Sequence, residues 1–370
     1  MVPGAGKSVL ASFVISEMRK HAATDLQVLY FFCKDDGHHT SNSAAAIASN
    51  LIYQLIERNP LESLLEILKE AREKHAKSGK FRVLWDIFVA MAQRFPTPIV
   101  VVVDALDECL IDRKEFLEGL TSFPDAKVRF FLTSRNELDI DNVLGCCPSI
   151  SKHLMDVEAD IEKFVIQRVE QLPRLHSFKT KVIQAVIKNS GGMFRYAALF
   201  LDELNSPDAL SKIPVMLRRP PADLNEMYNN ILLRLESADK KRQRHKSREI
   251  RRKILTWVGM AKKPLRVDEI AYACAVGDGE EMVDCTKRLL YSEQDILGKC
   301  GPLVEIIGGI VQYTHLSVRE YLFWSGSGDY YIREEYAHAA IAITSRKLLA
   351  SFSARLLART YQTFPLQHFG

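Results

Sequence analysis

The segment Pro3-Gly-Ala-Gly-Lys-Ser8 constrains this chain most, because two glycines, a lysine and a hydroxyl stand directly before an apolar helical pattern. It is the second half of the motif Gly-x-x-x-x-Gly-Lys-Ser/Thr. In that motif, backbone N–H groups of the loop and of the following helix face phosphate oxygens. We therefore expect Lys7 to reach the phosphates and the Ser8 hydroxyl to bind Mg²⁺, while Gly4 and Gly6 supply unusual backbone angles. The alternative is a glycine-rich turn with a chance Lys-Ser pair.

The start of the motif departs from the full pattern. Its first glycine should stand five residues before Gly6, where the chain has Met1, and no strand pattern leads into the loop. In P-loop folds that strand lies inside the sheet. We therefore expect a parallel sheet whose first strand is missing, a fragment or mis-started chain, poor solubility and weak nucleotide binding. An added upstream strand ending in glycine is expected to stabilise the chain, because a gap in a sheet leaves backbone groups unpaired.

Residues up to about 156 alternate between strand and helix patterns. Continuous apolar runs, typical of strands covered on both faces, occur at 26–33, 98–103 and 128–133. Helical spacing of apolar residues occurs at 8–22, 42–58 and 61–77. The alternation predicts an α/β P-loop domain with a mainly parallel sheet over residues 1–156.

Helical spacing dominates after residue 156. The predicted helices cover 158–171, 178–190, 193–205, 223–237 and 249–261. Short β-like runs at 302–305 and 309–313 flank Gly308-Gly309 and precede a helix at 316–323, which indicates a winged-helix-like unit. We predict an all-α helical domain at 157–240, a winged-helix-like domain at 241–325 and a C-terminal helical segment at 326–370.

An acidic cluster follows the second apolar run. Residues 99–109 read IVVVVDALDEC, so Asp104 ends a strand and lies at the carboxyl edge of the sheet, where P-loop proteins place Mg²⁺. Asp107 and Glu108 follow, and either is a candidate to orient or deprotonate an attacking water. The alternative is an ordinary strand followed by an acidic helix cap.

Polar residues also follow the third run. Residues 130–137 read FFLTSRNE, and the strand ends in Thr133, Ser134 and Arg135. A polar residue or an arginine at this place is suited to sense a γ-phosphate. Alternatively, Arg135 is a surface ion-pair partner.

The net charge of +4 is concentrated in one segment. Residues 240–253 hold nine Lys or Arg and one acid, Glu249, which is +8 and leaves −4 for the rest of the chain. A nucleic-acid-binding surface is therefore not expected. We expect the basic run to be a solvated insertion that interrupts a helix, with a nuclear-localisation or anion-binding patch as the alternative. No uncharged apolar stretch is long enough for a transmembrane helix.

The cysteines show no metal-binding pattern. No C-x-x-C pair and no Cys/His cluster with zinc spacing occurs among Cys33, Cys109, Cys146, Cys147, Cys274, Cys285 and Cys300. Reduced, buried thiols of an intracellular protein are expected.

Several motifs together resemble one family. They are GAGKS (4–8), YFFCKDD (30–36), VVVDALDEC (101–109) and FFLTSRNE (130–137), and they resemble fungal NACHT–ankyrin proteins, which are signal-transducing NTPases related to NOD-like receptors. The same region is similar to the N-terminal domain of nephrocystin-3-like proteins. Four later segments also resemble this family: 191–204, 218–232, 262–276 and 313–322.

The resemblance implies a role for each matching residue. The nucleotide phosphates would contact Gly4, Ala5, Gly6, Lys7, Ser8 and Val9. Ser8 would bind Mg²⁺ and Asp104 would hold it through water. Asp107 and Glu108 would be the catalytic acidic pair, and Arg135 would sense the γ-phosphate. Gly192-Met193-Phe194 stands where relatives carry a Gly-x-Pro motif that touches adenine. His315 matches a winged-helix histidine that contacts the β-phosphate of ADP, with a satisfied interdomain histidine as the alternative.

The leading functional hypothesis is a switch that binds ATP or ADP (or GTP) with Mg²⁺, hydrolyses slowly and forms homo-oligomers. Protein partners would bind through effector and repeat domains that this chain does not contain. A cytoplasmic location is expected, or a nuclear one through residues 240–253. The alternatives are a non-catalytic helical interaction module with a vestigial P-loop and, third, a metabolic P-loop kinase.

Overall fold

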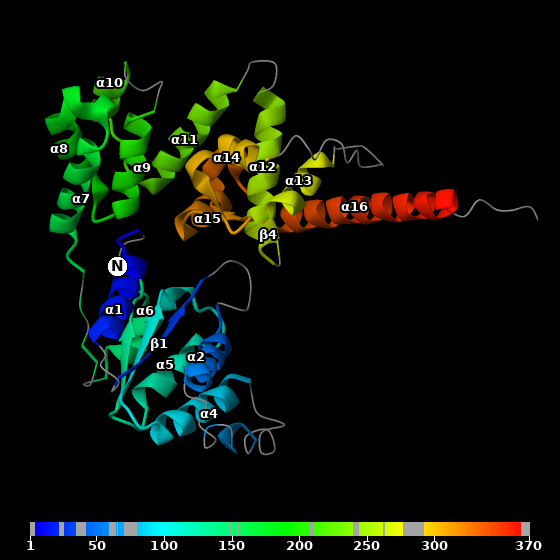
Figure 1. The fold of residues 1–370 in the computed structure, drawn as a ribbon. Helices are drawn as coiled ribbons and strands as arrows, with labels where there is room; N and C mark the ends of the chain where they lie inside the picture. The colour runs from blue at the N-terminus through cyan, green and yellow to red at the C-terminus, as the bar shows by residue number, and fades with distance from the viewer. Residues whose placement is uncertain are drawn as a thin grey trace, which may run out of the picture. The chain divides into compact units, whose positions relative to one another are not determined.

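The structure is a computed structural model of the chain. It describes residues 4–21, 26–34, 42–58, 64, 66–69, 80–147, 150–151, 153, 155–206, 211–239, 244–261, 263–276 and 292–363. The chain divides into two compact units, residues 1–198 and 199–370. Figure 1 draws both units.

The first unit is built on a three-stranded parallel sheet. Its strands are β1 (Gln27–Phe32), β2 (Ile99–Asp104) and β3 (Val128–Leu132), in the order β1-β2-β3. Strand β2 is central, and all six of its residues are buried. The predicted strands and their parallel arrangement are therefore confirmed. Among the described residues no strand precedes α1 (Lys7–His21), and β3 has no strand partner on its outer edge.

Helices cover both faces of the sheet, as Figure 1 shows. Val100 and Val102 of β2 pack on the α1 side with Ala11 and Ile15. The alternate β2 residues face the other core, which is built mainly by α2 (Ala44–Arg58), α4 (Lys80–Arg94), α5 (Arg113–Thr121) and α6 (Leu138–Leu144). Because side chains alternate along a strand, two covered faces explain why β2 is apolar throughout.

An aromatic cluster fills the core on the side of α4. Trp85 of α4 contacts the rings of Phe81, Phe88, Phe116, Phe123 and Phe130. Helix α4 was absent from the sequence prediction, although Phe81, Trp85 and Phe88 have helical spacing and are buried. The predicted helix at 61–77 lies largely outside the described residues.

The two edges of the sheet differ. At β1, the Tyr30 backbone N–H donates to Gln54 Oε1 at 3.2 Å, and Gln54 Nε2 donates to Tyr30 O at 2.7 Å. The amide of Gln54 thus takes the place of a neighbouring strand and blocks this edge. At the other edge, β3 borders a hollow of about 1000 Å³ whose lining includes Phe130 and Leu132.

Predicted helices in the middle of the chain are confirmed to within a few residues at their ends. They correspond to α7 (Glu158–Glu170), α8 (Lys179–Ser190), α9 (Phe194–Leu204) and α11 (Leu224–Ala238), with the short α10 (Ile213–Arg218) before α11.

The second unit contains a winged helix. Its helices are α12 (Arg244–Met260), α13 (Val267–Ala275) and α14 (Glu293–Cys300), and its small antiparallel sheet joins β4 (Leu265–Arg266), β6 (Ile310–Tyr313) and β5 (Val304–Ile307) in that order. Gly308 and Gly309 form the hairpin turn, with φ of 58° and 78°, which explains two consecutive glycines there. Helices α15 (Leu316–Phe323) and α16 (Glu334–Thr363) follow. None of the described helices has the length and apolarity needed to span a membrane.

The expectation of a helix-interrupting basic insertion is wrong for residues 244–253. Helix α12 begins at Arg244 and includes them. Arg251 is 1% exposed and donates to Lys299 O at 2.5 Å, to Tyr330 Oη at 2.9 Å and to Asp239 Oδ2 at 3.1 Å. One charge of the basic run is therefore buried inside the second unit, although the composition of the run indicates a solvent-exposed segment.

Further partners surround this arginine. Tyr330 donates its hydroxyl to Glu236 Oε1 at 2.8 Å, and Arg248 pairs with Glu236 and Asp329 at 2.7 Å each. The Arg251 network thus links α11, α12 and the segment before α16.

Replacing Arg251 with alanine is expected to lower the free energy of unfolding by about 3–5 kcal/mol, because it leaves buried acceptors without their charged donor. The exposed neighbour Arg252 on the same helix is the matched control, and its alanine variant should change stability by less than about 0.5 kcal/mol. Urea unfolding of both variants measures the difference. Equal losses would contradict the structural role of the network.

Candidate phosphate and magnesium site

The loop before α1 has the geometry of an anion site. Gly4 and Gly6 have φ of 75° and 88°, a region in which residues with a Cβ are strained. A Cβ on Gly4 would also lie 2.7 Å from Arg195 Cβ. The Leu10 N–H donates to Gly6 O at 3.0 Å, so the helical ladder begins directly after the loop. The N–H groups of the first turn therefore lie before the ladder and carry the positive end of the helix dipole.

Asp104 joins this loop to the sheet. It is 2% exposed at the end of β2, and Ser8 Oγ donates to its Oδ2 at 2.5 Å. Its other oxygen, Oδ1, accepts from Thr133 Oγ1 at 2.5 Å. The two residues predicted to hold Mg²⁺ are thus in direct contact, although 96 positions separate them in the sequence.

After Asp104 the chain makes a tight turn and enters a short helix that carries the next two acids, Asp107 and Glu108. Ala105 adopts the left-handed conformation, with φ 52° and ψ 50°, and the short helix Leu106–Glu108 follows. Thr133 Oγ1 accepts from the Ala105 N–H at 3.0 Å, and Thr133 O accepts from the Leu106 N–H at 2.9 Å. From the sequence, Thr133 is predicted only as one polar residue at a strand end. Thr133 and Asp104 both stand at the carboxyl ends of paired strands. This placement is the sequence feature from which their contact could have been predicted.

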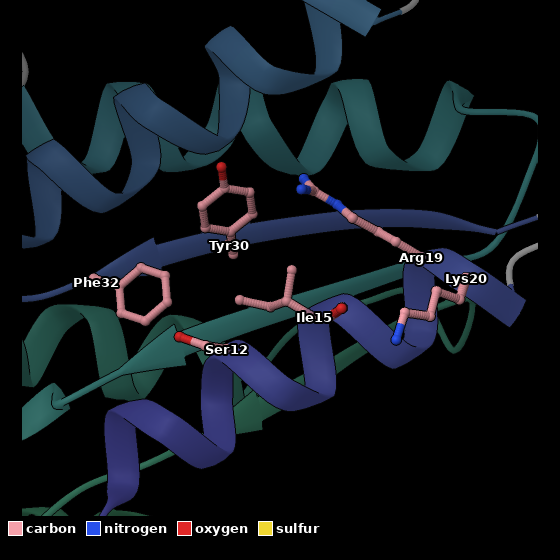
Figure 2. A pocket seen from close by; sticks show the side chains of 7 residues that line it. Ser12, Ile15, Arg19, Lys20, Tyr30 and Phe32 are labelled. Atoms are coloured by element: carbon pink, nitrogen blue, oxygen red, sulfur yellow. The ribbon is translucent and has the colours of Figure 1, made fainter.

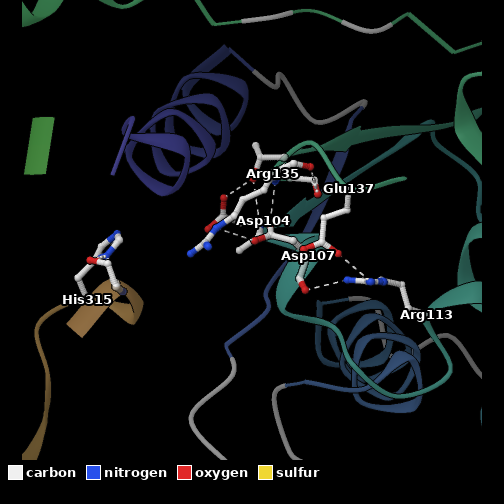
Figure 3. A network of polar contacts seen from close by, with 10 residues as sticks. Asp104, Asp107, Arg113, Arg135, Glu137 and His315 are labelled. Carbon is white, nitrogen blue, oxygen red and sulfur yellow. Dashed lines mark hydrogen bonds and ion pairs between the residues drawn. The ribbon is translucent and has the colours of Figure 1, made fainter. Parts of the chain in front are cut away.

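Asp107 and Arg135 form an ion pair. Asp107 Oδ1 accepts from the Arg135 backbone N–H at 2.9 Å, and Oδ2 lies 3.1 Å from Arg135 Nε. The Asp107 side chain is 4% exposed and the Arg135 side chain 20%. The candidate catalytic acid and the candidate γ-phosphate sensor are therefore paired with each other in this structure, as Figure 3 shows.

Arg113 braces the loop that carries this pair. Its Nη1 donates to Asp107 O at 2.8 Å, and its Nη2 donates to Glu137 Oε2 at 2.9 Å. It also pairs with Asp139. One arginine of α5 thus connects the loops after β2 and β3 (Figure 3). No motif in the sequence indicates this role of Arg113.

The charged side chains of the acidic loop and Arg135 affect the pKa of Lys7. Burial lowers its pKa, Asp107 opposes this shift, and Arg135 adds to it. Asp104 and Glu108 also favour the charged ammonium. Because burial dominates, the ammonium is not fully compensated by the protein. An anionic phosphate beside it would supply the missing negative charge.

One aromatic ring, that of Phe194, lies beside the loop. The Phe194 ring is 3.5 Å from the position that a Cβ on Gly6 would take, and it meets Phe164 edge to face at 5.7 Å. The Arg195 N–H donates to Gly4 O at 3.3 Å. The Gly192-Met193-Phe194 segment is therefore adjacent to the phosphate loop. Ala5 of the loop is buried, whereas the side chain of Val9 in the first turn of α1 is 75% exposed.

His315 caps α15 in the second unit. Its Nδ1 accepts from the Ser317 N–H at 3.1 Å and lies 2.7 Å from Ser317 Oγ, which is 2.8 Å from Tyr228 Oη. Because Nδ1 accepts from a backbone N–H, the proton of the neutral ring is on Nε2. His315 is also labelled in Figure 3.

A hollow of about 500 Å³ lies between α1 and β1, away from these groups (Figure 2). Its lining consists of Ser12, Ile15, Ser16, Arg19, Lys20, Tyr30 and Phe32. Arg19 stacks over the Tyr30 ring at 4.7 Å. The hollow contains none of the residues predicted to bind nucleotide, so we assign the chemistry to the carboxyl edge of the sheet.

The donors at that edge fit Mg²⁺. A serine hydroxyl and a carboxylate are hard oxygen ligands, and Mg²⁺ typically takes one or two protein oxygens together with substrate phosphates and water. No cluster of three or more His, Cys, Asp or Glu suited to a metal occurs in the described part of the chain.

Two parts of the chain match described protein families, and one curated relative matches most of its length. Residues 2–135 match the family described as nephrocystin 3, N-terminal, and residues 238–332 match the GPI inositol-deacylase winged helix domain. The vegetative incompatibility protein HET-E-1 of Podospora anserina is 24% identical over 346 residues, which is 88% of this chain and 24% of that protein. The chain thus spans about a quarter of that relative and is related to the NACHT-type P-loop NTPases with a winged helix.

One solved structure is also similar. It is that of the ORC1 protein of Aeropyrum pernix in complex with DNA, at 13% identity and a TM-score of 0.35, covering 88% of this chain and 85% of that one.

Two buried thiols lie behind the acidic loop and provide a test of its structure. A hydrogen bond with the Cys109 thiol, together with burial, raises the pKa of Cys33. Cys33 is therefore expected to resist iodoacetamide at pH 8 because its reactive thiolate is disfavoured, and Cys109 because its thiol is buried away from the reagent. The exposed Cys146 should react. Peptide mass spectrometry before and after unfolding measures this order, and early labelling of Cys109 would contradict the packing of the loop.

Proposed function

We propose, from its relation to the NACHT-type P-loop NTPases, that this chain is the nucleotide-dependent core of a signalling switch. It would bind ATP or ADP with Mg²⁺, with GTP as the alternative, hydrolyse slowly and change its assembly with the nucleotide. The Ser8–Asp104 contact carries the proposal, because it joins the phosphate loop to the acidic strand end. The name of HET-E-1 suggests a role in fungal vegetative incompatibility, and we extend that to this chain only as part of the proposal.

Phosphate binding is assigned to the loop and to the start of α1. The N–H groups of the first turn would donate to phosphate oxygens, and Lys7 would neutralise their charge. Ser8 and Asp104 would hold Mg²⁺, which supplies charge neutralisation of the phosphates when bound. The Phe194 ring would contact the base, in place of the proline of related proteins, because an aromatic face stacks on any base.

Hydrolysis is assigned to the pair of Asp107 and Arg135. A γ-phosphate would compete with Asp107 for the Arg135 guanidinium, since both are anions. Arg135 would then stabilise the transferred phosphoryl group, and the released Asp107, or Glu108, would orient the water and accept its proton. Breaking a buried ion pair costs free energy, which is consistent with slow turnover.

The winged helix would report the nucleotide state. We propose that His315 donates its Nε2 proton to the β-phosphate of ADP in a resting state, as the resemblance implies. Exchange for ATP would release this contact and allow homo-oligomers to form. We place the protein in the cytoplasm, with partners that bind through domains outside this chain.

Replacing Lys7 with alanine tests nucleotide binding. Loss of a desolvated charge-assisted contact costs about 2–5 kcal/mol, so the Kd for ATP should rise by about 30-fold to a few thousand-fold. The exposed Lys20 of the same helix is the matched control, and its alanine variant should bind like the wild type. Isothermal titration measures both. A wild-type chain that binds no nucleotide would favour the non-catalytic interaction module instead.

Asp104→Asn tests the metal site separately. The variant keeps the size of the side chain but loses the negative charge. It should bind ATP in EDTA like the wild type and lose most of the additional affinity that Mg²⁺ provides. Titrations with and without Mg²⁺ measure this difference, and an undiminished Mg²⁺ effect would assign the ion to other residues.

His315→Asn tests the proposed contact to ADP. Asparagine keeps an oxygen that can cap α15 but removes the imidazole donor. A hydrogen bond to a charged group is worth about 1.5–3 kcal/mol, so ADP affinity should fall by about tenfold or more while ATP affinity stays unchanged. The exposed His338 on α16 is the control position. Equal ADP affinities of the variant and the wild type would contradict the contact and leave His315 with only its structural role as the cap of α15.

A further inference from the structure

Thr133 is held between two partners that fix the direction of its hydroxyl. It is 3% exposed and directly follows β3. The Ala105 N–H can only donate, and it lies 3.0 Å from Thr133 Oγ1. The single hydrogen of the hydroxyl is therefore available to Asp104 Oδ1, 2.5 Å away. The backbone of Thr133 is itself fixed, because its N–H donates to Val103 O and its carbonyl accepts from Leu106 N.

We propose that Thr133 is a positioning residue for magnesium binding: its hydroxyl holds Asp104 Oδ1 so that Oδ2 faces Ser8 and the ion. The inference rests on the proposed function and adds a residue to it. A carboxylate turns easily about its last bond, because that torsion has broad wells. A fixed donor on one oxygen removes this freedom and directs the other oxygen.

The charge of the donor matters as much as its position. Both hydrogen bonds to the Asp104 carboxylate come from neutral hydroxyls, those of Ser8 and Thr133. Asp107, by contrast, is paired with the cationic Arg135. An arginine at position 133 would neutralise Asp104 and compete with a cation. A threonine satisfies one buried oxygen and leaves the negative charge for Mg²⁺.

The same hydroxyl also supports the turn after Asp104. Ala105 is left-handed, which is strained for a residue with a Cβ, and the surrounding contacts must maintain it. Thr133 accepts the buried N–H of this residue. One side chain therefore fixes both the carboxylate and the backbone that leads to Asp107 and Glu108.

Thr133→Val removes the hydroxyl at nearly constant volume, and Thr133→Ser restores it. Thr121→Val, on the exposed end of α5, is the matched control. Each variant is titrated with a fluorescent ADP analogue in EDTA and at increasing Mg²⁺, and its melting temperature is measured without nucleotide. The quantities compared are the ratio of the Kd in EDTA to that in saturating Mg²⁺, and the Mg²⁺ concentration at half effect.

For Thr133→Val we expect an unchanged Kd in EDTA and a Mg²⁺ requirement raised by about 10- to 100-fold, as for other residues that orient metal ligands. Thr133→Ser and Thr121→Val should retain the wild-type requirement. A merely structural role would weaken binding equally in EDTA and in Mg²⁺, whether or not the melting temperature falls.

Two results would overturn the inference. One is a wild-type Mg²⁺ response in folded Thr133→Val. The other is a lost Mg²⁺ response in folded Thr133→Ser, which remains decisive even where the valine variant does not fold. A wild-type chain that binds the analogue in neither condition would contradict the proposed function, and the inference with it. A wild-type chain that binds the analogue with a normal Mg²⁺ response supports the proposed function, and the variants then test the role of Thr133 separately.

Discussion

The hydrogen bond between Ser8 and Asp104 is the interaction on which the site depends. It requires α1 to start at the carboxyl edge of the sheet, which in turn requires the packing of Ala11 and Ile15 against Val100 and Val102. Burying a carboxylate is costly unless it is hydrogen-bonded. The two neutral hydroxyls on Asp104 therefore compensate the burial of this charge while keeping it available, and the apolar packing of α1 brings one of them there.

Much of the first unit could be predicted because its strands are covered on both faces. Six consecutive buried residues make β2 recognisable, and the placement of Asp104 follows from where that strand ends. The partnership of Asp107 with Arg135 could not be predicted. It depends on a left-handed alanine at 105, and the side-chain direction after such a turn is not encoded in apolar spacing. The roles of Thr133 and Arg113 could not be predicted for a related reason, since hydrogen bonds between loops depend on tertiary placement.

For the basic run at 240–253, a prediction was made from a strong local signal, its composition, and that signal was misleading. Nine cationic residues among fourteen suggest a solvated segment, yet Arg251 is almost completely buried. Its partners, such as Asp239 and Tyr330, come from outside the run, and one of them lies 79 positions away. Composition gives the average environment of a segment. The environment of one arginine is decided by acids and hydroxyls that only the fold brings close.

The two acids after β2 differ in how their charge is balanced, and this difference orders the steps of the proposed switch. Asp104 is held by hydroxyls, so a cation can be added without breaking an ion pair. Asp107 is held by Arg135, so it becomes available only when another anion takes the guanidinium. ADP lacks the phosphate that would do so. Under the proposed function, Mg²⁺ and ADP therefore bind with the Asp107–Arg135 pair intact, and only a γ-phosphate opens it. The discrimination between the two nucleotides then rests on competition for a single arginine, whose partner Asp107 is held at its backbone carbonyl by Arg113.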